Sequence, residues 1–116
     1  MPAPVLATTD LCDAHEADIR VLALPWLDLG GRRAFHGQVS TIKAFEDNSR
    51  VREAVAEAGH GRVLVVDGGG SLARAMLGDL LAARAVENGW EGIVIHGALR
   101  DSAAIATMDL GVKALG

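Results

Sequence analysis

The chain has few aromatic residues and fewer basic than acidic ones, and both shortages argue against a nucleic-acid-binding protein. Among its 116 residues there are two Trp, two Phe and no Tyr, too few for a surface on which nucleic-acid bases stack. Eleven Lys plus Arg against fifteen Asp plus Glu give a net charge of −4, and an acidic surface repels phosphate backbones. We therefore expect no direct nucleic-acid partner.

Cysteine and long apolar stretches are also scarce, and both shortages indicate in which cellular compartment the protein is expected. Cys12 is the single cysteine, so no internal disulfide can form and a reducing cytoplasm is expected. The N-terminal residues contain no basic region followed by an apolar stretch, so we expect no signal peptide. The run Val21–Leu27 is short and contains Pro25, so we expect no membrane span.

What the chain does have is short aliphatic runs, which predict a single α/β domain over residues 1–116. Half of the residues are hydrophobic. Strands are expected over 34–45, Val63–Val66, Ile93–Ile95 and Val112–Leu115, and helices over Asp10–His15, from Asn48 or Ser49 to about Ala58, over Leu72–Glu87 and from Asp101 to about Met108. This alternation is typical of right-handed βαβ units with a largely parallel sheet. Continuous apolar strands favour a sheet covered on both faces.

The ends of these helices are predicted from capping residues. Asp10, Asp101 and either Asn48 or Ser49 have side chains that accept backbone N–H bonds at a helix N-terminus. Gly59 is expected to supply a left-handed exit. Gly78 either lies within one long helix or divides it.

Two neighbouring strands are followed by loops whose residues can carry chemistry. The first loop, Asp67–Ser71, holds three glycines and forms either an anion-binding turn or a tight turn and nothing more. The second, His96–Asp101, ends in Arg100 and Asp101, which offer a guanidinium fork for an oxyanion and an oxygen ligand for Mg²⁺ or Mn²⁺. A capped helix with a surface ion pair would explain the same two residues.

Asp79 strengthens the functional reading of the second loop. In one long helix it would lie on the apolar side, where an unpaired carboxylate is costly. If Gly78 divides the helix, Asp79 lies at the start of the second part, beside free backbone N–H groups. Its structural alternative is an ordinary N-cap aspartate.

A dinucleotide site is a further possibility that the sequence argues against. Residues 68–73 fit the loose pattern G-x-G-x-x-G/A after a strand. Such a domain needs an acidic residue at the end of the next strand to hold the ribose, and His96 stands there.

Three stretches of the chain resemble the regulator of ribonuclease activity A (RraA) family and its enzymatic relatives, aldolases of 4-hydroxy-4-methyl-2-oxoglutarate and 4-carboxy-4-hydroxy-2-oxoadipate. The stretches span nearly the whole chain, in order: Thr8–Asp13; Gly30–Arg32 with Phe35–Val39 and Phe45–Asn48; and Val63–Ser71 with Leu77–Asp79, Gly92 and Gly97–Asp101.

The resemblance assigns roles to particular residues. The aldolases have an Asp, twenty intervening residues and then Arg-Asp, and Asp79 with Arg100 and Asp101 matches this spacing. The resemblance implies that Asp101 ligates a divalent metal, Mg²⁺ or Mn²⁺, and that Asp79 holds metal-bound water. It further implies that Arg100 binds the 2-oxo oxygen and that amides around Leu77 and Gly78 bind the pyruvyl carboxylate.

The family also implies a fold, an activity and an assembly. The fold would be a β/β/α swivelling domain, apparently truncated at its C-terminal part, in a homotrimer or a dimer of trimers. The activity would be that of a metal-dependent aldolase or decarboxylase that acts on small 2-oxo acids, oxaloacetate included, and releases pyruvate.

Other readings of the sequence are less favoured or remain as alternatives. Because Lys43 and Lys113 are the only lysines and neither lies in these loops, a Schiff-base aldolase is disfavoured. The alternatives are a non-catalytic protein that binds and inhibits ribonuclease E, and an inactive structural remnant. The older menaquinone methyltransferase label finds no support in this sequence beyond the glycine loop, which alone is too weak.

Overall fold

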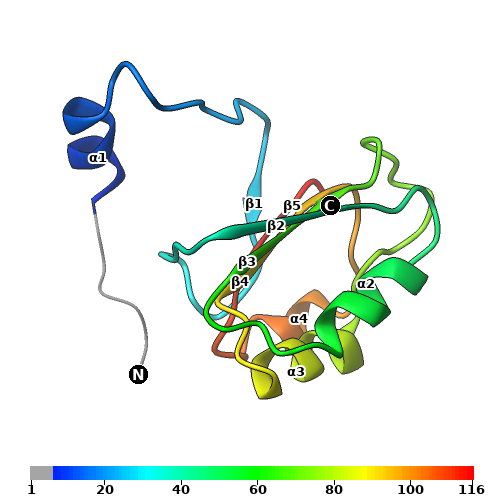
Figure 1. The fold of residues 1–116 in the computed structure, drawn as a ribbon. Helices are drawn as coiled ribbons and strands as arrows, with labels where there is room; N and C mark the ends of the chain where they lie inside the picture. Colours follow the sequence, from blue (N-terminus) through cyan, green and yellow to red (C-terminus); the bar gives the residue numbers. More distant parts are fainter. Residues whose placement is uncertain (1–6) are drawn as a thin grey trace.

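The computed structural model describes residues 7–116, which form helices and strands in alternation from β2 onward (Figure 1). The elements are α1 (Thr8–Ala14), β1 (Leu27–Asp28), β2 (Val39–Lys43), α2 (Ser49–Val55), β3 (Val63–Asp67), α3 (Asp79–Glu87), β4 (Gly92–His96), α4 (Ser102–Ile105) and β5 (Gly111–Ala114).

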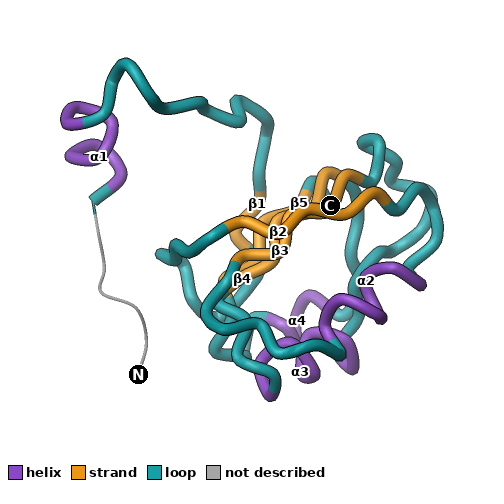
Figure 2. Tube along the Cα trace, viewed as in Figure 1, coloured by secondary structure: helices purple, strands orange, loops and turns teal. Residues whose placement is uncertain are grey.

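The strands form one sheet in the order β1-β5-β4-β3-β2. Strands β2 to β5 are parallel to their neighbours, and the short β1 pairs antiparallel with β5. This confirms the predicted α/β class with a largely parallel sheet. From β2 to β5, each strand lies beside the next one in the chain, so right-handed crossovers place α2, α3 and α4 on the same face of the sheet, as Figure 2 shows.

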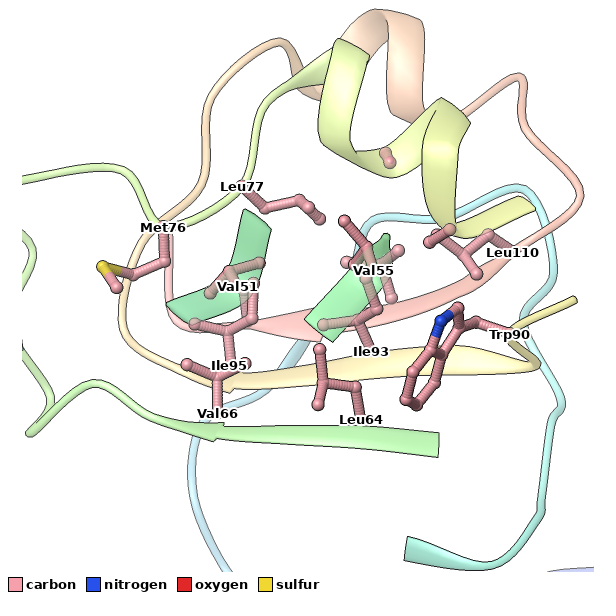
Figure 3. Close-up of a cluster of buried hydrophobic side chains, with 14 of the residues drawn as sticks. Val51, Val55, Leu64, Val66, Met76, Leu77, Trp90, Ile93, Ile95 and Leu110 are labelled. Carbon is pink, nitrogen blue, oxygen red and sulfur yellow. The ribbon is translucent and has the colours of Figure 1, made fainter. Parts of the chain in front are cut away.

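The hydrophobic core lies between this face and the helices (Figure 3). Alternate residues of β3 and β4 point toward the helices and are fully buried, as are apolar residues of α2 and α3: Leu64, Val66, Ile93, Ile95, Val51, Val55, Ala82 and Ala85. Burying one such large aliphatic side chain stabilises the fold by about 1.5–3 kcal/mol. The core therefore holds the carboxyl ends of β3 and β4 in fixed register.

The opposite face of the sheet is covered less than the sequence predicted. Val65, Val94 and Lys113 are half-buried there, and Thr41 and Lys43 are exposed. The expectation of a sheet covered on both faces is wrong for residues 7–116, because sequential right-handed crossovers put every crossover helix on one side.

Several predicted boundaries also change. The expected strand over 34–45 is limited to β2, and of the expected helix Leu72–Glu87 only α3 forms. Gly78 has extended backbone and precedes α3, so it divides the segment. The left-handed residues after α2 are His60 and Gly61, not Gly59.

Of the predicted N-caps, none makes a side-chain capping bond. Asp10 lies inside the first turn of α1. The carboxylate of Asp47 accepts hydrogen bonds from the backbone N–H and the hydroxyl of Ser49 at the start of α2.

The N-terminal segment extends away from the sheet before β1 (Figure 1). Helix α1 contributes no buried residue, and Val21, Leu22 and Leu24 are exposed. Within residues 7–116, no helix has the length and apolar character needed to cross a membrane.

Candidate active site

The predicted site residues come together where the loops that follow β3 and β4 run side by side. A bridge pairs Ala75 with Ala98. The amide of Met76 donates to the carbonyl of Ala98 at 2.8 Å, and the amide of Arg100 donates to the carbonyl of Leu77 at 2.9 Å. These bonds bring the start of α3 beside the end of the second loop.

Gly78, Asp79, Arg100 and Asp101 meet at this point. The Oδ2 atom of Asp101 accepts the backbone N–H of Asp79 at 3.1 Å, and it lies 3.7 Å from Nε of Arg100. A Cβ atom on Gly78 would lie 3.1 Å from that Nε and 3.2 Å from that Oδ2. A side chain at this position would therefore push both charged groups by a few tenths of an ångström.

Asp101 is held in a strained backbone conformation. Its φ of 59° and ψ of 36° are left-handed, and its side chain makes no capping bond to α4. The predicted capping role is therefore wrong, because the carboxylate faces the amide of Asp79 instead. For a residue other than glycine, a left-handed backbone conformation costs of order 1–3 kcal/mol of conformational free energy. Such residues cluster at functional sites.

The amides of Leu77 and Gly78 are candidate donors to a ligand. Within residues 7–116, neither N–H group donates a hydrogen bond. They directly precede α3, whose N-terminal end carries partial positive charge. The side chain of Leu77 is buried in the core and fixes the backbone at this place. An anion with two oxygens suits such a pair of donors.

The same residues line an open cavity of about 670 Å³, a size typical of ligand pockets. The lining comes from the loops and from one side of α2 and α3: Glu46, Asp47, Asn48, Arg52, Ala73, Arg74, Ala75, Leu77, Gly78, Asp79, Leu80, Leu81, Arg84 and Arg100. Four of the five predicted site residues are in this lining, and the fifth, Asp101, contacts them as described above.

Sequence reasoning missed three arginines of this cavity. Arg52 lies on α2, Arg74 in the loop after β3 and Arg84 on α3. They are far apart in the chain and belong to no motif, so only the packing of α2 beside α3 brings them together.

The glycine loop after β3 serves as a tight turn. Gly69 and Gly70 have positive φ values of 67° and 76°. The amide of Gly69 donates to Oδ1 of Asp67 and that of Gly70 to the carbonyl of His96. Because these donors already have partners within the chain, the structural reading of this loop is favoured over the anion-binding one.

Asp101 offers oxygen atoms that suit a hard cation. Within residues 7–116, no three His, Cys, Asp or Glu side chains converge on one point. Mg²⁺ commonly keeps several waters and binds through one or two carboxylates. A site with Asp101 as the carboxylate ligand, beside a cavity open to water, fits that pattern.

Comparison with known proteins assigns the fold to a family. The family profile described as RraA-like, Aldolase/RraA, matches residues 8–116. The chain belongs to the RraA-like family. A relative from Alkalilimnicola ehrlichii is 61% identical over 108 residues, which are 93% of this chain and 67% of that protein. A relative from Pseudomonas aeruginosa PAO1 is 56% identical over 108 residues, 93% of this chain and 67% of its own length. Both carry the provisional name 4-hydroxy-4-methyl-2-oxoglutarate aldolase.

Two solved structures share the RraA-like fold. One, from Geobacillus kaustophilus, is titled S-adenosylmethionine:2-dimethylmenaquinone methyltransferase; it has a TM-score of 0.93 and 49% identity, over 96% of this chain and 69% of that one. The other, from Thermus thermophilus, is titled the RNA-processing inhibitor RraA; it has a TM-score of 0.91 and 46% identity, over 95% of this chain and 66% of that one. These matches confirm the fold class that the motifs predicted.

Proposed function

We propose that the protein is a divalent-metal-dependent lyase that cleaves or decarboxylates small 2-oxo acids and releases pyruvate. The candidate substrates are 4-hydroxy-4-methyl-2-oxoglutarate, 4-carboxy-4-hydroxy-2-oxoadipate and oxaloacetate. The observation that carries the proposal is the meeting of Asp79, Arg100 and Asp101 around Gly78, beside a cavity that three of these four residues line. The name shared by the relatives supports the same reaction class.

The pyruvyl end of the substrate would bind first through its carboxylate. The unpaired amides of Leu77 and Gly78 donate to its two oxygens, and the N-terminal end of α3 favours the negative charge. This binding places the neighbouring 2-oxo group toward Arg100, which lines the same cavity.

Arg100 would stabilise the charge that develops during the reaction. Breaking the C3–C4 bond leaves its electron pair on C3, next to the 2-oxo carbon, from where it delocalises onto the 2-oxo oxygen as an enolate; C4 leaves as a carbonyl compound in the aldol cleavage and as carbon dioxide in the decarboxylation. A guanidinium directed at this oxygen binds the transition state more tightly than the substrate, and removal of one such donor typically costs about 3 kcal/mol of barrier.

Asp101 and Asp79 would have separate roles in this chemistry. Asp101 would hold the Mg²⁺ or Mn²⁺, which when bound supplies a Lewis acid for the enolate oxygen. Asp79 would orient a water molecule in the cavity and move a proton, first from the 4-hydroxyl group and later to the methylene carbon of the enolate.

The assembly proposed for the enzyme is a homotrimer or a dimer of trimers. The apolar side chains exposed between α1 and β1 support self-association.

A second candidate function is inhibition of ribonuclease E by direct protein binding. The observation that favours it is the likeness to the structure titled the RNA-processing inhibitor RraA. An inhibitor of this kind does not need Arg100 and Asp101 as a pair, so their substitution separates the two functions.

The test of the lyase is pyruvate release from 4-hydroxy-4-methyl-2-oxoglutarate and from oxaloacetate, in the presence of Mg²⁺ or Mn²⁺. Because divalent metals decarboxylate oxaloacetate by themselves, each rate is corrected with metal alone. We expect protein-dependent release that disappears after EDTA treatment and returns with added metal. Unchanged release after exhaustive EDTA treatment would exclude the metal-dependent mechanism, and no release with either substrate would exclude the lyase.

A further inference from the structure

We infer that the carboxamide of Asn48 binds the oxygen of the substrate's 4-hydroxyl group during aldol cleavage, so that this residue serves the cleavage of 4-hydroxy acids and not the decarboxylation of oxaloacetate. The inference rests on the proposed function, because it assigns the leaving half of the substrate, which Arg100 and the amides of Leu77 and Gly78 do not bind.

The first support is the position of Asn48 at the cavity. Strands β2, β3 and β4 are adjacent and parallel, so the loops that follow them lie at one edge of the sheet. The loops after β3 and β4 supply Gly78 and Arg100, and the loop after β2 supplies Asn48 to the same cavity. Neighbouring strands are roughly 4.8 Å apart, close enough for one small molecule to contact adjacent loops. A substrate whose pyruvyl end lies at Gly78 therefore extends along the cavity toward the loop after β2.

The second support is that the chain around Asn48 is fixed while the side chain of Asn48 is unused. The carboxylate of Glu46 accepts the hydroxyl of Ser71 at 2.8 Å, and Glu46 has a left-handed φ of 53°, a strained conformation typical of functional sites. Asp47 accepts the backbone N–H and the hydroxyl of Ser49. Within residues 7–116, the side chain of Asn48 makes no hydrogen bond, to the start of α2 or elsewhere. Its carboxamide is thus available to a ligand from a fixed position.

The third support is the chemical type of this side chain. Among the described residues that line the cavity, Asn48 is the one uncharged polar residue, and it is half-buried. A carboxamide both donates and accepts hydrogen bonds, so it matches a neutral hydroxyl group, whereas a guanidinium group matches a carboxylate. The neutral polar groups of a 4-hydroxy-2-oxo acid are the 2-oxo oxygen, which Arg100 would bind, and the 4-hydroxyl group, which remains for Asn48.

The role of Asn48 follows from the movement of electrons in the cleavage. The 4-hydroxyl proton leaves through the water that Asp79 orients, the O–H electron pair becomes the second bond of the new C4 carbonyl group, and the C3–C4 pair passes into the enolate. Negative charge develops on the 4-oxygen as its proton departs, and an N–H donor from Asn48 stabilises it there.

The same donor has no such effect on the decarboxylation of oxaloacetate. This acid has no 4-hydroxyl group, and its C4 carboxylate loses negative charge as carbon dioxide forms. A donor to that carboxylate binds the transition state no more tightly than the substrate, so it does not accelerate the reaction.

The experiment compares the two reactions in the same variants, with the rate of metal alone subtracted. The substrates are 4-hydroxy-4-methyl-2-oxoglutarate and oxaloacetate. Asn48→Ala removes the carboxamide, and Asn48→Asp keeps its size and an accepting oxygen but cannot donate when ionised. Arg50→Gln is the control, because Arg50 is exposed in the first turn of α2 and does not line the cavity.

We expect both Asn48 variants to lose about tenfold or more in kcat with the 4-hydroxy acid and to change less in KM, because the donor acts on charge that develops in the transition state. With oxaloacetate both should stay within about twofold of the parent, as should Arg50→Gln with either substrate. Equal losses with the two substrates, or parental cleavage of the 4-hydroxy acid by either Asn48 variant, would overturn the role of Asn48 while leaving the lyase intact. So would a parent that decarboxylates oxaloacetate without cleaving the 4-hydroxy acid.

If the parent turns over neither substrate, the proposed function is wrong and calorimetric binding decides the role of Asn48. The probes are 4-hydroxy-2-oxoglutarate and 2-oxoglutarate, which differ in the 4-hydroxyl group alone. Tighter binding of the hydroxylated probe by the parent, with the difference lost in Asn48→Ala, supports the contact. Equal binding of the two probes, or binding of neither, overturns it.

If the parent cleaves the 4-hydroxy acid alone, binding of 2-oxoglutarate takes the place of the oxaloacetate rate. Unchanged affinity for 2-oxoglutarate in both Asn48 variants, together with the loss of cleavage, supports the role. A matching loss of that affinity overturns it.

Discussion

Arg100 and Asp101 are neighbours in the chain, and their different surroundings predict different effects of substitution. Asp101→Asn removes a charged oxygen ligand, so it should weaken metal binding, and excess Mn²⁺ should restore part of the activity. Arg100→Lys retains the charge but loses the planar fork, so turnover should fall about tenfold or more while metal affinity stays close to that of the parent. Mn²⁺ titration of each variant, with pyruvate release as the readout, measures both effects.

A surface ion pair would behave otherwise at these two positions. Such a pair is worth under about 1 kcal/mol of stability, so both variants would retain the activity of the parent. Parental activity in both would mean that the contact between Asp101 and the amide of Asp79 only shapes the loop. Thermal melting of both variants is the control that separates loss of chemistry from loss of fold.

At the scale of elements, an ion-pair cluster attaches the segment before β2 to the sheet. Nη1 of Arg32 lies 2.6 Å from Oε1 of Glu91, and Nη2 lies 2.8 Å from Oδ1 of Asp109. Burial acts to lower the pKa of Arg32, but the hydrogen bonds to Glu91 and Asp109 raise it overall, so the group stays charged. The cluster lies at the amino ends of β4 and β5, opposite the candidate site.

The prediction for this cluster concerns stability alone. Arg32→Met leaves the carboxylate of Glu91, whose side chain is 10% exposed, without its cation, and should lower the free energy of unfolding by about 3 kcal/mol. Asp109→Asn is the control: that side chain is 74% exposed, and we expect a loss below about 1 kcal/mol. Urea denaturation gives both values. If both variants lost the same free energy of unfolding, the burial of Glu91 would not be what determines the loss.

For the whole molecule, the prominent feature is the segment between α1 and β1, which runs outside the body of the domain (Figure 1). Val21 is 71% exposed and Leu22 is 60% exposed. Exposed apolar surface of this kind is typical of an interface between chains, and we expect it to bind a second copy.

The protein is therefore predicted to self-associate in solution. Val21→Asp combined with Leu22→Asp should shift the assembly toward the monomer, because two charges would enter an apolar contact. Sedimentation velocity over a range of concentrations measures the shift. Arg20→Gln, in the same segment, alters charge without removing apolar surface and should leave the assembly unchanged. A parent protein that sediments only as a monomer at high concentration would contradict the prediction.

Elements with local signals can be predicted from the order of residues alone. The apolar runs at 63–66 and 93–95 became β3 and β4, since a run of that length and composition needs a buried strand. The spacing from Asp79 to Arg100 and Asp101, known from the family resemblance, also marked residues that the fold brings into contact. The strands were predictable because their signals follow from the order of residues along the chain, and the meeting of the two loops was predictable because parallel strands end at one edge.

Features that depend on contacts between distant segments become visible only in the folded chain. The start of α3 at Asp79 depends on residues 75–77 pairing with the loop after β4 in place of continuing a helix. The one-sided covering of the sheet follows from the strand order. The gathering of Arg52, Arg74 and Arg84 at one cavity follows from the packing of α2 beside α3. For α3 the residues offered Gly78 as a break without deciding it, and the other two features have no periodic or local signal, because they arise from long-range packing that a pattern in the chain does not record.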